Sequence, residues 1–263
     1  MGERRNYLLS GCPKTAQEAG DLYDAALKQG VSLFVSTLEA NEAPDRMNNF
    51  WTKEKLAQIP LRFGWKIEHV GNHLLAERAK EAKGTRTPQL IETCLIATKD
   101  GEEDRILTHI HYDAWRDHHA APNEGLLLTL LARIERIQEA KETAFEVNCK
   151  GGVGRTGTVV ISHYIRRKID EELEKGVALD AIALNVPEIT YEFRKQRRGV
   201  LSHGSQLTQV YSIASAYYEQ LKAAQVAAAQ VRSLRETASQ SKGKPSLGDA
   251  PAMQPTSVAS LTS

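Results

Sequence analysis

The sequence predicts an α/β fold, with a single domain built on a central mixed, twisted β-sheet flanked by helices. Segments with helical spacing of apolar residues alternate along the chain with short apolar runs that are typical of buried strands. Two alternating apolar runs also surround Lys99-Asp100-Gly101, which is the pattern of a β-hairpin. The hairpin adds antiparallel neighbours to a sheet of strands separated by helices, so we expect a mixed sheet.

The elements of the first half follow in order. An amphipathic helix is expected over residues 14–29, where the pattern ends at Gly30. The apolar run VSLFVSTL at 31–38 predicts a buried strand. A helix near 48–57 precedes a strand-rich stretch that contains WKIEHVGN, QLIETCLIAT and DRILTHIHY.

The second half returns to helices. An amphipathic helix is expected at 124–140, and AFEVNC at 144–149 is the last expected strand. Further helices are expected at 155–169, 187–198 and 203–220.

Composition limits the class of protein. The chain has 263 residues, of which 41% are hydrophobic, so it can bury a core without disulfides or metals. No apolar run approaches ~18 residues, so no transmembrane segment is expected, and the N-terminus lacks the apolar region of an export signal. A net charge of +1 argues against a nucleic-acid partner. Three scattered cysteines are typical of reduced thiols, which predicts a cytoplasmic location.

The C-terminal segment differs from the rest. No aromatic residue follows Tyr218, and from about Thr237 the chain is small and polar, with Pro and Gly. An Ala- and Gln-rich stretch before it is expected to extend a helix outward. We therefore expect a folded domain over 1–225 and a low-complexity, disordered tail over 226–263.

The most informative segment is FEVNCKGGVGRTGT, which begins at Phe145. An alternating strand ends at Cys149, a glycine-rich loop follows, and an apolar helix opens at Arg155. Backbone amides of such a loop converge at a helix N-terminus and form a cradle for a phosphate or an oxyanion. The residues expected to line this cradle are Lys150, Gly151, Gly152, Val153, Gly154 and Arg155.

Three interpretations compete for this loop. Gly152-Val-Gly154-Arg-Thr-Gly157 satisfies a dinucleotide fingerprint, but no second strand ending in an acidic residue follows about 20 residues later. A nucleotide P-loop would need lysine before Thr156, where Arg155 stands. The third interpretation is a Cys-x5-Arg-Thr nucleophile loop, which the glycines and the strand–loop–helix context favour.

This third interpretation assigns a chemical role to three side chains. Loop amides, the helix dipole and Arg155 favour the thiolate form of Cys149. The guanidinium of Arg155 can bind two phosphate oxygens at once, which lysine cannot do. Thr156 is expected to donate a hydrogen bond to the thiolate and so ease its departure.

NCKGGVGRTG resembles the signature loop of cysteine-dependent protein tyrosine phosphatases. The segment from His111 to Pro122, with Trp115 and Asp117, is similar to the mobile general-acid loop of that family. The resemblance implies that Asp117 is the general acid, and Asp113 is a rival in the same loop.

The resemblance extends over roughly residues 6–218. Gln206-Leu207 resembles the glutamine loop, which makes Gln206 the candidate that positions water. VSLFVSTLEANE resembles the segment that braces the signature arginine, so Glu39 or Glu42 is expected to orient Arg155. A basic cluster near the end of one helix is otherwise expected to be a solvated face: Arg194, Lys195, Arg197 and Arg198.

The chain departs from the family pattern at several positions. Asn148 replaces the histidine that usually precedes the cysteine, Arg116 replaces the proline of the acid loop, and Ser202 stands where the first glutamine is usual. No counterpart of the phosphotyrosine-recognition loop occurs in this sequence.

The resemblance implies two-step phosphate hydrolysis without a cofactor or a metal. Cys149 attacks phosphorus, Arg155 and the loop amides hold its oxygens, and Asp117 serves as acid and then as base. Histidines at 109, 111, 118 and 119 raise zinc as an alternative, but they fall on one strand and in one loop, with no cysteine beside them.

Three functions remain open. The first is a phosphatase acting on phosphotyrosine in a phosphorylated protein. The second is a phosphoinositide or inositol phosphate phosphatase, which Lys150 beside the nucleophile favours, whereas Val153 stands where lipid-directed relatives often have a second lysine. The third is a pseudophosphatase that binds phosphate without turnover. The divergence would also suit a secreted bacterial effector that acts in the host cytosol.

Overall fold

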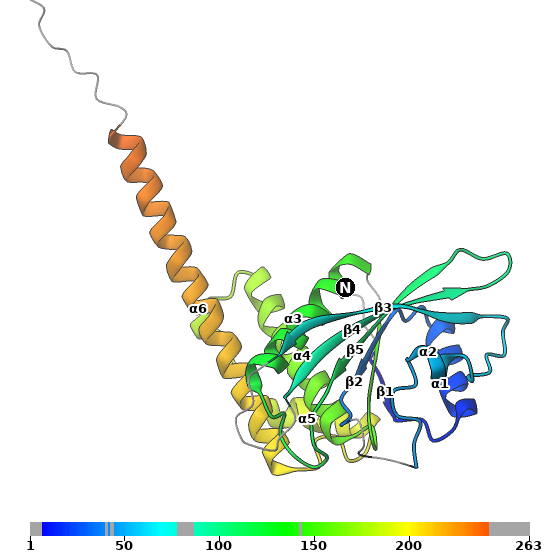
Figure 1. Ribbon diagram of the computed structural model, residues 1–263. Helices are drawn as coiled ribbons and strands as arrows, with labels where there is room; N and C mark the ends of the chain where they lie inside the picture. Colours follow the sequence, from blue (N-terminus) through cyan, green and yellow to red (C-terminus); the bar gives the residue numbers. More distant parts are fainter. Residues whose placement is uncertain (1–6, 40–41, 43–44, 78–86, 142–143, 242–263) are drawn as a thin grey trace, which may run out of the picture. The chain divides into compact units, whose positions relative to one another are not determined.

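The computed structural model describes residues 7–39, 42, 45–77, 87–141 and 144–241 (Figure 1). A six-stranded mixed sheet has the strand order β1-β6-β2-β5-β4-β3. The strands β1, β6, β2 and β5 are mutually parallel, whereas β5, β4 and β3 are antiparallel neighbours. The strands are β1 (Tyr7–Gly11), β2 (Leu33–Ser36), β3 (Lys66–Glu77), β4 (Gln89–Thr98), β5 (Arg105–Tyr112) and β6 (Phe145–Cys149). The predicted α/β class with a mixed sheet is confirmed.

The helices follow the predicted order. The helix expected near 48–57 is shorter, and the helix expected at 203–220 continues to Ser241, whereas the other helices differ by only a few residues at their ends. The helices are α1 (Ala16–Lys28), α2 (Lys53–Leu56), α3 (Glu124–Lys141), α4 (Gly154–Glu174), the 3₁₀ helix η1 (Leu179–Ala181), α5 (Val186–Gln196) and α6 (Gly204–Ser241). The side chain of Thr15 caps α1, and Asn185 caps α5, because each accepts a hydrogen bond from an amide of the first turn. The sequence did not predict β1 or η1.

The predicted hairpin is confirmed. The strands β4 and β5 pair antiparallel, with Ala97 opposite Arg105 next to the turn. Gly101 has a φ of +79° in that turn, a conformation that glycine adopts without strain.

The sheet separates two apolar cores. One core contains apolar residues of α3 and α4, including Leu130 and Val160, packed against strand residues such as Val147. The other contains residues of α1 and α2, such as Tyr23, packed against strand residues such as Phe34. Helices therefore cover both faces of the sheet (Figure 1), and the C-terminal end of β6 emerges between two packed layers.

The chain consists of two compact units, Met1–Glu219 and Gln220–Ser263. The helix α6 continues to Ser241, so it includes the first part of the segment 226–263 that the sequence predicts as disordered. Alanine and glutamine favour helix, which explains why the helix runs past residue 226. Residues 242–263 of the expected tail lie outside the described residues. Among the residues that the structure describes, no helix has the length and apolarity needed to cross a bilayer.

Candidate active site

The strand β6 delivers Cys149 to the start of the glycine-rich loop, and α4 begins at Gly154 directly after that loop. The side chain of Cys149 is buried, and its Sγ accepts a hydrogen bond of 3.2 Å from the amide of Gly152. A backbone donor therefore stabilises negative charge on this sulfur, as predicted for a cradle at a helix N-terminus.

Gly152 is required at its position for two reasons. It has a φ of +67°, and a Cβ added there would lie 2.2 Å from the carbonyl oxygen of Ser10. The loop can therefore pack against β1 only with glycine at this residue.

Arg155 is fully buried, and its two terminal nitrogens bind the carboxylate of Glu42. Nη1 donates to Glu42 Oε2 at 2.5 Å, and Nη2 donates to Glu42 Oε1 at 2.6 Å. Of the two predicted candidates, Glu42 is thus the residue that orients Arg155, and Glu39 donates its own amide to Glu42. Nε of Arg155 has no hydrogen-bond partner among the described residues, so one guanidinium donor is left for a ligand.

The charge of Arg155 is maintained by its neighbours. Burial opposes that charge, but the hydrogen bonds that Arg155 donates to Glu42 and the electrostatic effect of its neighbours Cys149, Glu42 and Asp117 outweigh it, so the pKa of Arg155 is raised. The guanidinium is a permanent cation at the centre of the site.

The acid loop reaches Arg155 at two points. Nη1 of Arg155 donates to the carbonyl of Trp115 at 2.6 Å, and Nη2 donates to Oδ1 of Asp117 at 3.1 Å. The Asp117 side chain is 30% exposed, so it borders both the buried arginine and solvent. Asp113 is buried and accepts a hydrogen bond from the amide of Ala114, which gives it a role in the turn. The geometry favours Asp117 over Asp113 as the proton donor.

The acid loop is held to the start of α6 by side chains. His118 Nδ1 and His203 Nε2 lie 2.5 Å apart, and Gln206 Nε2 donates to the carbonyl of His119 at 3.3 Å. Gln209 accepts from the amide of Ala121 at 2.7 Å and donates to its carbonyl at 3.2 Å. These contacts close the loop over Arg155 in the described structure. Neither His203 nor Gln209 is predicted from the sequence.

Gln206 lies at the predicted place, between the acid loop and the signature loop. It is buried, and a Cβ added to Gly154 would meet its amide group at 2.8 Å. Its Oε1 has no hydrogen-bond partner in the described part of the chain, so it is available to accept from a water.

Thr156 is fully buried at the start of α4. Its hydroxyl makes no hydrogen bond within the described residues, and the contact to Cys149 Sγ comes from Gly152. The predicted bond from Thr156 to the Cys149 sulfur is absent among the described residues.

Arg197 braces the loop from behind, which the sequence does not predict. Its Nε donates to the carbonyl of Gly152 at 2.6 Å, and Nη2 donates to the carbonyl of Gly151 at 3.4 Å. With these carbonyls turned toward Arg197, the amides of the same loop are free to face the opposite side. Arg194 is exposed, as expected for a solvated basic face, although its guanidinium also donates to the carbonyls of Val200 and Leu201. Arg197 is only partly exposed, so the expectation is wrong for Arg197.

A family model described as protein-tyrosine phosphatase matches residues 2–216 of the chain. The chain belongs to the protein-tyrosine phosphatase family. The resemblance stated from the signature and acid loops is thereby confirmed.

Curated relatives and solved structures agree with this membership. The chain is 25% identical over 160 residues to tyrosine-protein phosphatase non-receptor type 7 of Mus musculus, covering 60% of this chain and 40% of the relative. It is 23% identical over 224 residues to tyrosine-protein phosphatase non-receptor type 5 of Homo sapiens, a match that covers 84% of this chain and 35% of the relative. A structure of PTPN18 in complex with HER2 phosphopeptides superimposes with a TM-score of 0.63 at 19% identity, covering 81% of this chain and 72% of that one. The chain thus spans less than half the length of these two curated relatives.

The four histidines considered for zinc make separate contacts in the structure. His109 bonds Ser36 and stacks on Trp51, and His111 bonds the carbonyl of Leu38. His118 and His119 lie in the acid loop. Within the described ranges, no group of three or more His, Cys, Asp or Glu residues is arranged for a metal ion.

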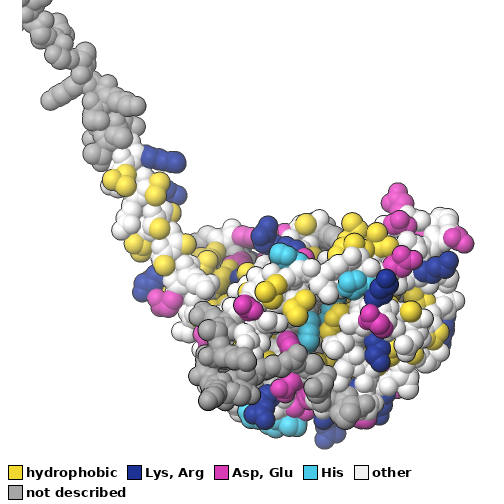
Figure 2. Space-filling model, viewed as in Figure 1, with side chains coloured by type: hydrophobic (Ala, Val, Ile, Leu, Met, Phe, Trp, Pro, Cys, Tyr) yellow, Lys and Arg dark blue, Asp and Glu magenta, His cyan; other side chains and the backbone are white. Residues whose placement is uncertain are grey.

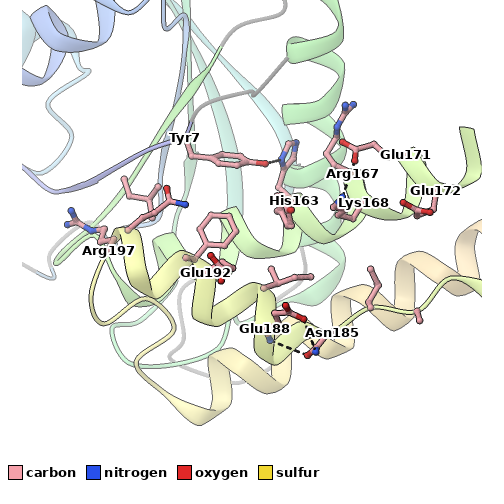
Figure 3. Close-up of a pocket in the computed structure, with 17 residues that line it drawn as sticks. Tyr7, His163, Arg167, Lys168, Glu171, Glu172, Asn185, Glu188, Glu192 and Arg197 are labelled. Atoms are coloured by element: carbon pink, nitrogen blue, oxygen red, sulfur yellow. Dashed lines mark hydrogen bonds and ion pairs between the residues drawn. The ribbon is translucent and has the colours of Figure 1, made fainter. Parts of the chain in front are cut away.

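The chain also has a cavity away from the signature loop. A cavity of about 840 Å³ lies beside β1, α4 and α5, where Tyr7 points toward His163 (Figure 3). Of the catalytic-loop contacts described above, only Arg197 lines it. Figure 2 shows Lys, Arg, Asp and Glu side chains interspersed over the visible face of the first unit, so that face carries no field of a single sign.

Proposed function

We propose that this protein is a phosphatase that hydrolyses phosphotyrosine in proteins through a cysteinyl-phosphate intermediate. One observation carries the proposal. The guanidinium of Arg155 donates hydrogen bonds to Glu42 and Asp117, while its Nε has no hydrogen-bond partner among the described residues. The Cys149 sulfur accepts a hydrogen bond from the amide of Gly152 in the same loop. Nucleophile, phosphate-binding cation and acid therefore meet in one site.

In the first step, Sγ of Cys149 attacks phosphorus and the bond from phosphorus to the phenolic oxygen breaks. Asp117 transfers its proton to that leaving oxygen. The loop amides from Lys150 to Gly154 and Nε of Arg155 bind the three equatorial oxygens, whose charge grows in the transition state. The products are the free phenol and a phosphorylated Cys149.

In the second step, water attacks the phosphorylated Cys149 and the phosphorus–sulfur bond breaks. Asp117, now ionised, accepts a proton from this water. Oε1 of Gln206, which has no partner among the described residues, accepts the other water hydrogen and fixes its direction. Inorganic phosphate leaves, and the thiolate of Cys149 is restored.

The substrate class rests on the family. PTPN18 is described in complex with HER2 phosphopeptides, and curated relatives are named tyrosine-protein phosphatases. A phosphorylated protein is accordingly the proposed partner. A cytosolic site of action, and the bacterial-effector setting, stay predictions.

The test compares native protein with Cys149→Ser on p-nitrophenyl phosphate in the presence of a chelator. Activity that survives the chelator and is lost in the serine variant supports the thiolate mechanism. No turnover by folded native protein contradicts it and favours a phosphate-binding pseudophosphatase. A panel of phosphotyrosine peptides and phosphoinositides then decides the substrate, and preference for the lipids contradicts the proposal.

A further inference from the structure

A chain of buried hydrogen bonds runs across four strands behind the nucleophile. Ser10 on β1 donates to Oε1 of Glu146 at 2.5 Å, and Nδ2 of Asn148 donates to Oε2 of Glu146 at 3.0 Å. Ser36 on β2 donates to Oδ1 of Asn148 at 2.9 Å and lies 2.8 Å from Nε2 of His109 on β5. Four of these five side chains have no solvent exposure: Ser36, His109, Glu146 and Asn148.

Asn148 directly precedes the nucleophile, and its position is fixed on three sides. Its side chain is held by Glu146 and Ser36, and its carbonyl accepts from both the amide and the hydroxyl of Thr37, at 3.0 and 3.2 Å. The carbonyl of Cys149 accepts from the amide of Cys12 at 2.7 Å. The strand end that presents Cys149 therefore depends on Asn148, and the orientation of the Asn148 amide depends on Glu146.

Glu146 is unusual because a buried carboxyl group costs free energy that apolar side chains would not. Its donors in the described structure, Ser10 and Asn148, are both neutral. Burial raises the pKa of Glu146 to about 7, against the opposing effect of these two hydrogen bonds. The network thus contains a group that changes its charge near neutral pH.

The other titratable groups that face Glu146 do not change their protonation state near neutral pH. Tyr23 faces it from α1, Cys12 follows β1, and His109 lies beyond Ser36. Burial raises the pKa of Tyr23, raises that of the Cys12 thiol to about 12, and lowers that of His109 well below its usual range. Of these four groups, only Glu146 titrates near neutrality.

We propose that Glu146 is a positioning residue that acts on Cys149 through Asn148. Its hydrogen bond fixes the Asn148 side chain in the place of the histidine usual at that position, and so holds the end of β6. Ionisation of Glu146 adds a negative charge behind the nucleophile and opposes thiolate formation there. The inference rests on the proposed role of Cys149 as the nucleophile.

The test uses two variants of the full chain, with alkylation of Cys149 as a readout that needs no turnover. Glu146→Gln keeps the shape of the side chain and a hydrogen-bond acceptor for Asn148, but it cannot ionise. Glu146→Leu removes both the acceptor and the ionisable group. Iodoacetamide modification of Cys149 is followed by peptide mass spectrometry from about pH 5 to about pH 9, and kcat and KM are measured on p-nitrophenyl phosphate.

We expect the glutamine variant to match native protein below about pH 6 and to alkylate faster above pH 7, by up to about tenfold if the coupling is near one pH unit. Glu146→Leu should have a lower kcat than native protein at every pH, with little change in KM. Glu146→Gln should have a kcat close to that of native protein, because it keeps the acceptor for Asn148. Superimposable alkylation profiles of native protein and Glu146→Gln would overturn the proposal. If the leucine variant does not fold, the glutamine profile alone decides.

Glu135→Gln is the matched control. Burial favours the neutral form of Glu135, but His163 and Arg167 outweigh it and lower its pKa to about 2, so the group stays ionised over the tested range. Its replacement should leave the shape of the alkylation profile unchanged. If the alkylation profile of Glu146→Gln differs from that of native protein but native protein has no phosphatase activity, the positioning role is upheld and the proposed function is contradicted. If native protein is an active phosphatase but the two alkylation profiles coincide, the proposed function is upheld and the positioning role is contradicted.

Discussion

Glu42 binds both terminal nitrogens of Arg155, and this pair leaves Nε of the arginine as its one unbound donor among the described residues. The carboxylate side chain is only 8% exposed and the guanidinium is fully buried. A buried pair of this kind fixes the direction of the remaining donor, because the planar guanidinium cannot rotate without losing both bonds.

Glu42→Ala should lower kcat on p-nitrophenyl phosphate by about 100-fold, because Arg155 loses the partner that aims it at phosphate. It should also destabilise the fold by roughly 3 kcal/mol, since the buried cation Arg155 loses its bidentate counter-ion and keeps only the partly exposed Asp117. Glu39→Ala, in the same segment, is the control and should change kcat little. Equal effects of the two variants on kcat would contradict the assignment of Glu42.

Asp117→Asn should lower kcat by about 100-fold or more, since asparagine cannot supply the proton to the leaving oxygen. The loss should be larger on phenyl phosphate than on p-nitrophenyl phosphate, because phenolate is the poorer leaving group and needs that proton more. Asp113→Asn keeps an acceptor for the Ala114 amide and should leave this difference between substrates unchanged. The kinetics of the two substrates are compared at one pH.

Gly152→Ala should abolish most activity, because the new Cβ would lie 2.2 Å from the Ser10 carbonyl oxygen and the loop would have to move. Gly151→Ala is its control. The atom nearest to a Cβ at Gly151 is 3.7 Å away, an ordinary contact. Competitive inhibition by inorganic phosphate measures the affinity of the loop for phosphate. An unchanged phosphate affinity in Gly152→Ala would show that the loop tolerates the added Cβ and would contradict this prediction.

Arg197→Ala should lower kcat/KM by about tenfold, because a charged hydrogen bond of this kind contributes about 1.5 kcal/mol. The neighbouring Arg198 is exposed, so Arg198→Ala removes the same charge without removing the brace. A charge-steering role would make the two variants equal and salt-sensitive, whereas a brace makes only Arg197→Ala defective at every ionic strength.

Glu146→Gln should make the stability of the fold less sensitive to a rise in pH from about 5 to about 8. The carboxyl has a pKa raised from 4.5 to about 7 in the fold, so its favourable contribution is complete below 4.5 and is lost as pH rises through about 7. The span between the two values corresponds to on the order of 3 kcal/mol. Urea unfolding of native protein at about pH 5 and about pH 8 should show this loss, and Glu146→Gln should not. Parallel losses in both proteins would contradict the raised value.

Much of the fold was predictable because local patterns agree with it. The alternation of apolar runs placed five of the six strands, and Lys99-Asp100-Gly101 marked the hairpin. The sequence does not predict β1, whose residues Tyr7–Gly11 are all half-buried rather than buried. Its place is fixed by pairing with β6, which lies far along the chain.

The sequence by itself determined the family, the nucleophile loop and the acid loop, because these depend on residues that are neighbours along the chain. The positive φ of Gly152 and the spacing from Cys149 to Arg155 are local requirements of one strand–loop–helix turn. Only the tertiary structure decided between Glu39 and Glu42, since that choice depends on which carboxylate reaches Arg155 across the sheet edge. The same reason applies to Arg197 and Glu146, whose contacts join segments that are far apart along the chain.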